Sequence, residues 1–451
     1  MDNASPAGSW TPHPAKDEPL RTLPFTARIL LAATLAVQPS LVLAQDPQGA
    51  ANRLGRLVEA AWRHAPEVQA SLARVRADAA DARQAGAPAM PWLEVDARDT
   101  RWLGEAADGM RRIRLGLPFR YPWQWPGQWA LLREVEAWQE ASERAVRLEV
   151  AEAIARAWID LAAARAATGV AHRLTDRQQV VFEVERTRIE QGLAPPVERV
   201  LMEVERARSA ARLRKAQVDE AEAAGEVAWL AGEPAEVTEE DLLDLVAATR
   251  TPEGAPSVLV ERMRSGAAFR AVEALSNRNR EEGRTRMADA MGTPRLEIGI
   301  RQERDADLVS PDLSAVVGLR VPIPAGRGVR QERIEGAARV AEAEHDRTAR
   351  LAEHEARLSS ALATARASED WLSSFGHVLD GLTGAEAALA SRHRLRETSG
   401  ADYLRDLDRL ARVRLEILDA ARTLLAARLE LAVLLEDPQA FPPLFGRTLA
   451  P

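Results

Sequence analysis

Residues 91–95 read Pro91-Trp92-Leu93-Glu94-Val95, and residues 294–298 read Pro294-Arg295-Leu296-Glu297-Ile298. A second pair of similar segments, Leu117-Pro118-Phe119 and Val321-Pro322-Ile323, has the same separation of about 205 residues. Solenoid repeats are far shorter, at roughly 20 to 50 residues. The chain therefore duplicates one large unit, in which a helix, two strands and two long helices follow one another.

The strands of each unit are predicted by strict alternation of apolar and polar residues. In residues 112–119, Ile113, Leu115, Leu117 and Phe119 alternate with arginine, glycine and proline. Successive side chains of a strand point to opposite faces, so one face is apolar and the other is charged. A half-buried soluble sheet gives this pattern, and so does an outer-membrane barrel. Both interpretations remain open at this point.

Four long helices fill most of the remaining sequence, and the first would be about 90 to 100 Å long at ~1.5 Å per residue. No single globular domain has that width. We predict a signal peptide at 1–44, a first repeat at 45–233, a linker at 234–256, a second repeat at 257–437 and a loose tail at 438–451. The strands are expected at about 92–98, 111–119, 295–301 and 313–323, and the long helices at about 127–191, 197–230, 329–396 and 403–435.

The amino-terminal segment has the pattern of a secretory signal. Arg21 and Arg28 precede an apolar run at 29–37, and Val42 and Ala44 suit cleavage after Ala44. The alternative is a single anchoring helix, but the run is shorter than the ~20 residues that a bilayer span needs.

Composition restricts the classes of function. Aromatic residues are only 4% of the chain, and Ala, Arg, Glu and Leu dominate, as in long packed helices. The net charge of −8, with basic and acidic residues interleaved, disfavours a nucleic-acid partner. Cysteine is absent, the seven histidines are dispersed, and no phosphate loop or nucleophile motif occurs. We therefore predict no enzyme, no metal site and no cofactor.

Four strands cannot close a barrel, because two edges would remain unpaired, and lipid does not tolerate them. If the strands span a membrane, the chain must oligomerise, and three chains give twelve strands. Aromatic residues gather near the first hairpin, either as an interfacial belt or as packing at a strand–helix junction. The belt candidates are Trp92, Trp123 and Trp125, and the candidates for the polar, lumen-facing side are Glu94, Arg112, Arg114, Arg301 and Arg320.

Over its mature length the sequence resembles the TolC-type outer-membrane efflux proteins. The resemblance rests on the duplicated plan, on His64-Ala65-Pro66-Glu67 ahead of the first strand, and on Gly318-Leu319-Arg320-Val321-Pro322-Ile323. It also includes Arg186 to Gly192 and Gly400 to Asp408, which are similar to the family's two helical tips.

This resemblance implies a mainly α-helical protein that forms a homotrimer with a 12-stranded β-barrel, four strands per chain, in the outer membrane of a Gram-negative bacterium. Its helices would form a tunnel reaching into the periplasm. The implied function is a passive exit duct for substrates delivered by a periplasmic adaptor and an inner-membrane pump of the RND type. Segment 192–198 is similar to the heavy-metal subgroup typified by CzcC, which implies heavy-metal cations. The alternatives are a duct for drugs or other small solutes, and a soluble periplasmic coiled-coil scaffold or adaptor.

The two tips supply the remaining candidate residues. The candidates for a gate are Asp402, Asp406 and Asp408, any of which could line it, with Arg405 and Arg409 as basic partners; a solvated charge network gives the same pattern. Gly192 aligns with Gly400 in this comparison, which makes the second tip one residue shorter. We expect adaptor docking at Gly192, Leu193, Gly400 and Ala401, where the alternative role of each glycine is a helix C-cap.

Overall fold

The computed structural model describes residues 47–86, 90–98, 109–304, 312–323 and 327–445. The predicted signal peptide at 1–44, with its cleavage site, lies outside these residues. The helices are α2 (Pro47–His64), α3 (Pro66–Gly86), α4 (Trp125–Glu190), α5 (Pro196–Ala231), α6 (Asp241–Ala248), α7 (Pro256–Arg264), α8 (Ala267–Asp289), α9 (Arg327–Arg394) and α10 (Gly400–Leu435), with short 3-10 helices η1 (Pro122–Gln124) and η2 (Pro442–Phe445). The strands are β1 (Trp92–Arg98), β2 (Gly109–Pro118), β3 (Arg295–Arg304) and β4 (Asp312–Arg320).

The four strands form one antiparallel sheet in the order β1-β2-β3-β4. Each half contributes one hairpin, and the halves meet where β2 pairs with β3. The register places Leu93 opposite Leu115, Leu115 opposite Ile298, and Ile298 opposite Val317. Apolar residues therefore share one face across all four strands, which confirms the predicted fold class of long helices with two strands in each half.

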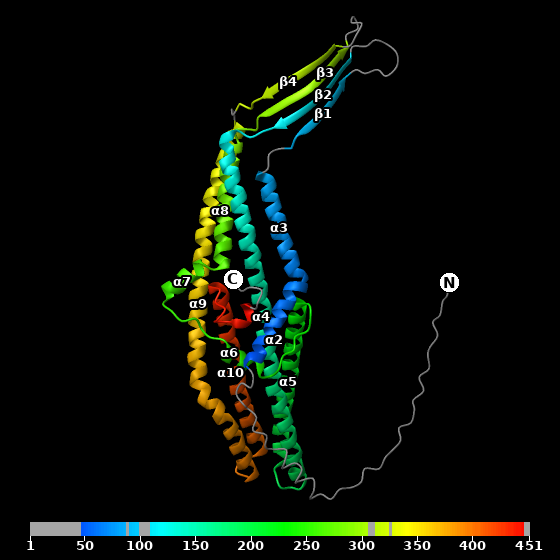
Figure 1. The fold of residues 1–451 in the computed structure, drawn as a ribbon. Helices are drawn as coiled ribbons and strands as arrows, with labels where there is room; N and C mark the ends of the chain where they lie inside the picture. The colour runs from blue at the N-terminus through cyan, green and yellow to red at the C-terminus, as the bar shows by residue number, and fades with distance from the viewer. Residues whose placement is uncertain (1–46, 87–89, 99–108, 305–311, 324–326, 446–451) are drawn as a thin grey trace, which may run out of the picture. The chain divides into compact units, whose positions relative to one another are not determined.

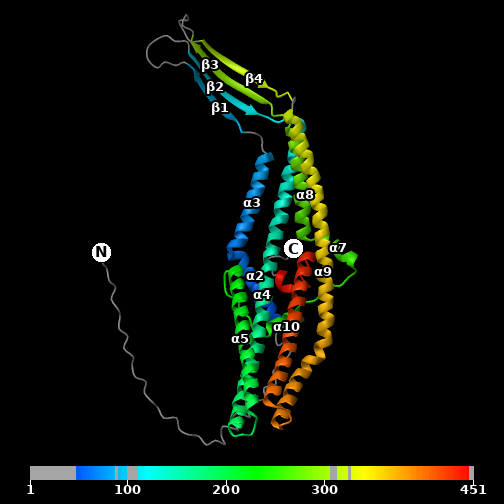
Figure 2. The ribbon, with the colours of Figure 1, turned by 180° about the vertical axis from the view of Figure 1, so that it is seen from behind.

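Two very long helices carry the rest of the fold (Figures 1 and 2). Helix α4 has 66 residues and α9 has 68, so each is about 100 Å long. Toward the sheet, α4 packs against α3 and α8, and farther along it packs against α5 and α10. Helix α9 contacts α8 and then α10 in the same way. The long helices thus connect the sheet to the turns at their far ends.

Small side chains form the helical seams, which explains how so few aromatic residues suffice. Ala155 and Ala162 of α4 and Ala421 of α10 are fully buried. Close approach of helices lets many weak dispersion contacts accumulate without large rings. The buried aromatic residues of α4 are Trp138, Trp158 and Phe182, and Trp158 has 1% of its surface exposed.

Two segments pack more tightly than the sequence predicts. The linker at 234–256 contains α6, whose Leu242 and Leu245 are fully buried. The tail is not loose over residues 438–445, since Ala440, Phe441 and Leu444 are all 0% exposed and η2 packs against α2. The apolar residues of both segments fill the core.

A buried arginine joins the linker to the long helices. Arg428 of α10 is 7% exposed, and its Nη1 donates to the carbonyl oxygens of Val246 and Thr249, each at 2.8 Å. Its Nη2 donates to Glu369 of α9 at 2.7 Å. One guanidinium of α10 therefore satisfies acceptors from the linker and from α9, which planar geometry with five donors allows.

Candidate functional site

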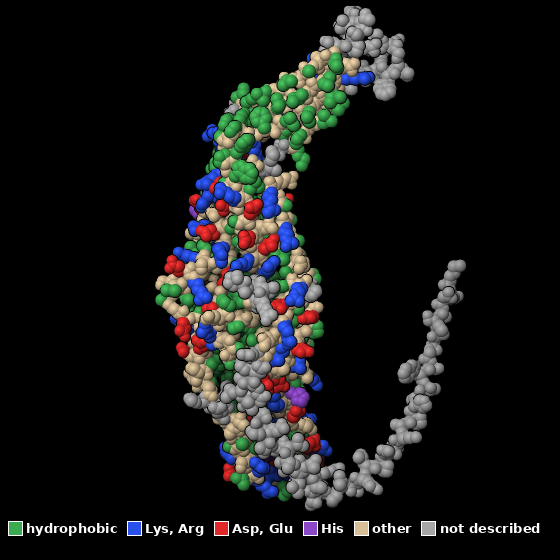
Figure 3. All heavy atoms as spheres, in the orientation of Figure 1, with side chains coloured by type: hydrophobic (Ala, Val, Ile, Leu, Met, Phe, Trp, Pro, Cys, Tyr) green, Lys and Arg blue, Asp and Glu red, His purple; other side chains and the backbone are tan. Residues whose placement is uncertain are grey.

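The sheet presents an apolar face that no part of the described chain covers. Figure 3 shows hydrophobic side chains gathered over the strands. The exposed fraction runs from 39% for Leu115 to 73% for Val317. The other exposed apolar residues of this face are Leu93, Val95, Ile113, Ile298, Ile300, Leu313 and Leu319. A contiguous patch of this kind marks a surface that contacts lipid or protein. Separately, no helix among the described residues is both long and apolar enough to cross a membrane.

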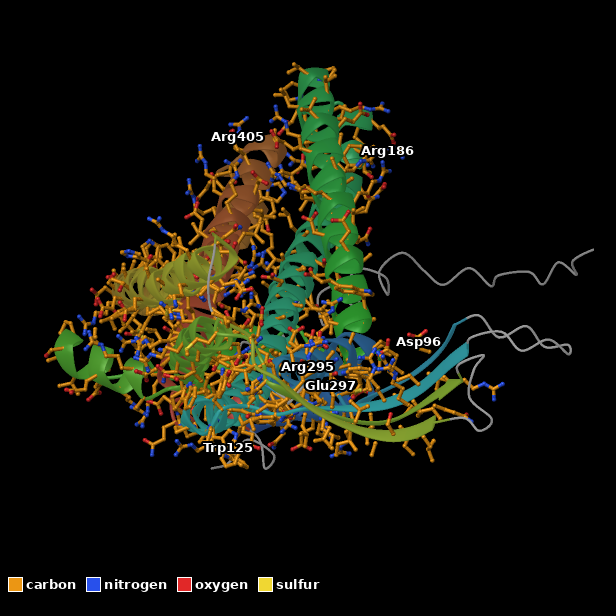
Figure 4. All side chains as sticks on the ribbon, turned by 90° about the horizontal axis from the view of Figure 1, so that it is seen from above. Asp96, Trp125, Arg186, Arg295, Glu297 and Arg405 are labelled. Carbon is orange, nitrogen blue, oxygen red and sulfur yellow. The ribbon has the colours of Figure 1, made fainter. Side chains whose placement is uncertain are left out.

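The opposite face carries a line of alternating charges. Arg114 of β2 lies 2.9 Å from Glu94 of β1 and 3.6 Å from Glu297 of β3. Glu297 also lies 3.5 Å from Arg320 of β4. We call this series, Glu94–Arg114–Glu297–Arg320, the charge ladder; it crosses all four strands, and Figure 4 labels Glu297 on β3. The two other lumen candidates, Arg112 and Arg301, face each other on the same side by register.

Two glycines make room for large side chains that lie along this polar face. A Cβ at Gly299 would lie 2.5 Å from the Ile113 carbonyl oxygen and 2.9 Å from Cγ of Arg114. A Cβ at Gly116 would overlap the ring of Trp92, which sits opposite it in the register. Trp92 therefore lies on the polar face, so its assignment to a lipid-facing belt is wrong.

The other two belt candidates are exposed where the sheet meets the helices. Trp123 is 60% exposed and Trp125 is 54% exposed, and Tyr121 stacks on Trp123 with ring centroids 4.3 Å apart. Trp125 begins α4 (Figure 4). Indole rings at such a junction combine an apolar surface with an N–H donor, as residues at a water–lipid boundary do.

At the far ends of the long helices, the two halves make the same turn. Gly192 has φ of 71°, and its N–H donates to Ile189, while that of Leu193 donates to Arg188. Arg396 has φ of 65°, and the N–H groups of Arg396 and Glu397 donate to His393 and Arg392. Both are Schellman caps. The counterpart of Gly192 is therefore Arg396, exactly 204 residues later, and the alignment with Gly400 is wrong.

Gly400 has a different task from Gly192. It opens α10, and a Cβ there would lie 2.7 Å from Cγ of Glu185 and 2.9 Å from the sulfur of Met202. Its N–H donates to Glu198 at 2.7 Å. Gly400 and Ala401 are buried between the two tips, so in this chain they are not free for docking. Leu193, by contrast, is 58% exposed.

The candidate gate carboxylates fall into two groups. Asp402 accepts from the Ser399 hydroxyl at 3.0 Å and pairs with Arg405 at 2.8 Å, and Asp406 pairs with Arg409 at 2.9 Å. Both aspartates remain accessible, and Figure 4 shows Arg405 on α10 and Arg186 on the neighbouring α4.

Asp408 lies elsewhere, because two residues turn a helix by about 200°. It is 2% exposed and bonds to Arg412 of its own helix and Arg212 of α5. In this conformation Asp408 joins two helices of one chain, whereas Asp402 and Asp406 remain accessible.

An open groove of about 770 Å³ lies between α4, α8 and α9. Burial raises the pKa of its Glu152, with nearby Arg156 opposing the change. Burial lowers the pKa of its His354, and Arg357 lowers it further. No cluster of three metal-binding side chains occurs within the described ranges. The groove therefore has charged walls but no grouping of metal ligands.

Solved structures share this architecture. The structure of CusC superposes with a TM-score of 0.65 and 16% identity, over 85% of this chain and 92% of that one. The outer-membrane protein VceC from Vibrio cholerae gives 0.65 and 16%, over 85% and 96%. The CmeC outer-membrane channel of Campylobacter jejuni gives 0.64 and 12%, over 86% of each chain. No family model and no curated protein matches the sequence.

The chain therefore has the fold of outer-membrane channel proteins, as the resemblance to TolC-type proteins implied. At these identities the similarity concerns architecture. Four strands, two long helical hairpins and a packed region around α2 and α6 occur in one chain that spans most of each of these proteins.

The two Schellman turns lead to a test of backbone strain. Arg396→Gly is expected to stabilise the second tip by about 0.5 to 1 kcal/mol, because glycine tolerates positive φ, although it loses more entropy on ordering. Hydrogen–deuterium exchange of the amides around residues 391–399 measures this local stability. Gly192→Arg is the reverse substitution at the first tip and is expected to accelerate exchange there. Faster exchange in Arg396→Gly would contradict the assignment.

Proposed function

We propose that the protein is the outer-membrane exit duct of a tripartite efflux system in a Gram-negative bacterium. Three copies form a 12-stranded barrel in the outer membrane and a helical tunnel in the periplasm. A periplasmic adaptor and an inner-membrane pump of the RND type deliver the substrate. The observation that carries this proposal is the uncovered apolar face of a sheet whose other face is charged.

The amphipathic sheet favours a membrane over a soluble scaffold. Its apolar side chains would remain in water in a soluble scaffold, at a cost of about 25 cal/mol for each Å² exposed. Lipid removes that cost, but only if the free edges of β1 and β4 find partners. Pairing β4 with β1 of a second copy satisfies both edges, and three copies give an even strand number typical of outer-membrane barrels.

The proposed duct acts by providing a passage rather than by chemistry. The long helices α4 and α9 would line a tunnel about 100 Å long. At the tips, threefold symmetry would gather Asp402 and Asp406 near the axis, each with its own arginine partner. Such pairing lowers the repulsion that like carboxylates would otherwise exert. Leu193, exposed beside Gly192, is the proposed contact for the adaptor.

Heavy-metal cations are the proposed substrate class, on the basis of segment 192–198. Within this segment, Pro196 begins α5 and Glu198 accepts the N–H of Gly400. The segment thereby sets the distance between the two tips. The segment would contribute to function through the shape of the entrance. The delivering pump would select the solute.

Orientation of the sheet can be measured with spin labels. A label at position 115 is expected to be relaxed by oxygen dissolved in lipid, and a label at position 114 by a water-soluble nickel complex. The reason is that Leu115 lies on the apolar face and Arg114 on the charge ladder. Power-saturation spectra in proteoliposomes provide the comparison. Equal lipid exposure at both positions would exclude a membrane-spanning sheet.

Single-channel conductance tests the entrance. Asp408→Ala is expected to raise conductance in planar bilayers, because it releases the bonds from α10 to Arg212 of α5 and loosens the closed tip. Asp406→Ala is expected to raise it less, since its partner Arg409 belongs to the same helix. Asp419→Ala, an exposed aspartate farther along α10, is the control. Unchanged conductance in both tip variants would remove these aspartates from the gate.

Substrate class is tested by deleting the gene and measuring growth. The deletion strain is expected to lose tolerance to zinc, cobalt or cadmium salts and to regain it with the intact gene. Growth on a panel of drugs is measured in parallel. Sensitivity to drugs alone would replace metal cations by organic solutes, while the duct itself would still stand.

A further inference from the structure

The two ends of the charge ladder carry opposite charges, and both lie on open edges of the sheet. Glu94 is on β1, with 43% of its side chain exposed, and Arg320 is on β4, with 64% exposed. Within one chain each end has a single partner from the ladder. An edge that ends in a carboxylate and an edge that ends in a guanidinium are complementary.

We propose that Arg320 of one chain pairs with Glu94 of a second copy, so that three ladders join into one closed ring of alternating charges. This inference rests on the proposed trimer and adds the register in which its chains meet. The ring would lie on the polar face, with six glutamates and six arginines at one level of the barrel.

The direction of pairing agrees with the topology. All neighbouring strands in the sheet are antiparallel, so β1 and β4 run in opposite directions. When β4 of one copy lies beside β1 of the next, the contact is therefore antiparallel as well. The same pattern of hydrogen bonds then continues around the barrel without a change of strand direction.

Strand tilt determines which residues meet. In the direction perpendicular to the strands, Glu94 shares a row with Arg114, Gly299 and Val316. Barrel strands tilt by typically 35–45°, with about 4.8 Å between strands and about 3.3 Å per residue. We call a line drawn around the barrel at constant height a level line. Over the four steps from β1 of one copy to β1 of the next, a level line therefore shifts, relative to the perpendicular row, by roughly four to six residues along the strand.

The shift runs toward the helical end of β4. Seen from the apolar face, the strands rise to the right, away from the helices, with β4 along the upper-left edge of the sheet and β1 along its lower-right edge (Figures 1 and 3). A level line from β1 to β4 must then descend toward Arg320. The ladder itself descends in this sense, since Glu297 and Arg320 lie two and four residues below the row of Glu94.

Only even shifts keep the polar faces together, because a one-residue slip would turn every side chain to the other face. A shift of four residues from Val316 places the second copy's glutamate opposite Arg320, and a shift of six places it opposite Pro322. Of Arg320 and Pro322, only Arg320 carries a charge that can pair with the glutamate. The tilt, the face and the charge therefore select the same residue.

Disulfide cross-linking tests this register, and the chain contains no cysteine of its own. The double variant Glu94→Cys/Arg320→Cys is expected to give covalent trimers on a non-reducing gel after mild oxidation in membranes. A bond within one chain is excluded, because positions 94 and 320 are three strands apart, about 14 Å or more, and a disulfide needs Cα atoms within about 7 Å. The two single variants are the controls.

Two further pairs examine the alternative registers. Glu94→Cys/Val316→Cys and Glu94→Cys/Pro322→Cys place the second thiol four residues above and two residues below Arg320. Cross-linking at position 320 in preference to both supports the proposed ring. Preference for position 316 or 322 would overturn it.

The oligomeric state of the unoxidised variants, measured by native mass spectrometry in detergent, separates this inference from the proposed function. Trimers that do not cross-link at positions 94 and 320 would overturn the ring and leave the duct intact. Monomers, in the variants and in the unaltered protein alike, would overturn both.

Discussion

An amphipathic four-stranded sheet that cannot be completed within one chain is the constraint on which the rest of the structure depends. Its apolar face has no covering layer among the described residues, and its outer strands leave backbone donors and acceptors unpaired. Lipid can cover the face, but lipid offers nothing to the edges. In the proposed trimer, edge pairing between copies and burial of the face in a bilayer would therefore be linked requirements, and neither would be sufficient without the other.

The two halves have the same backbone turn at their tips, but the side chains there make different contacts. In the first half, Gly192 adopts positive φ without strain and leaves Leu193 exposed. In the second, Arg396 adopts the same conformation, and Gly400 brings α10 close to Glu185 and Met202. The first tip thus exposes Leu193 to solvent, while residue Gly400 of the second tip is packed against the first half. A repeated unit has become two kinds of helical end without any change in loop length.

Much of this fold follows from the sequence, because period two identifies strands and long alanine-rich stretches identify helices. The strand faces were predictable residue by residue for the same reason. The tips were harder: the alignment followed the glycine at position 400, while positive φ fell on Arg396, whose residue type gives no signal. Trp92 resembles the belt candidates in residue type, but it lies two residues from Glu94 on β1 and therefore on the same, polar face. Burial of Asp408 depends on α5, which is distant in sequence and supplies Arg212.

The charge ladder also bears on how a duct could pass cations without retaining them. Both ladder carboxylates, Glu94 and Glu297, already contact arginine, and Glu297 is contacted from two sides. A passing cation must compete with guanidinium groups tethered at the wall. Conduction needs binding weak enough to release the solute, and a neutralised carboxylate meets that need better than a bare one. Pairing also lowers the cost of keeping charges near a low-dielectric wall. In the proposed duct, the contacts that position the strands would therefore keep the passage from becoming a binding site.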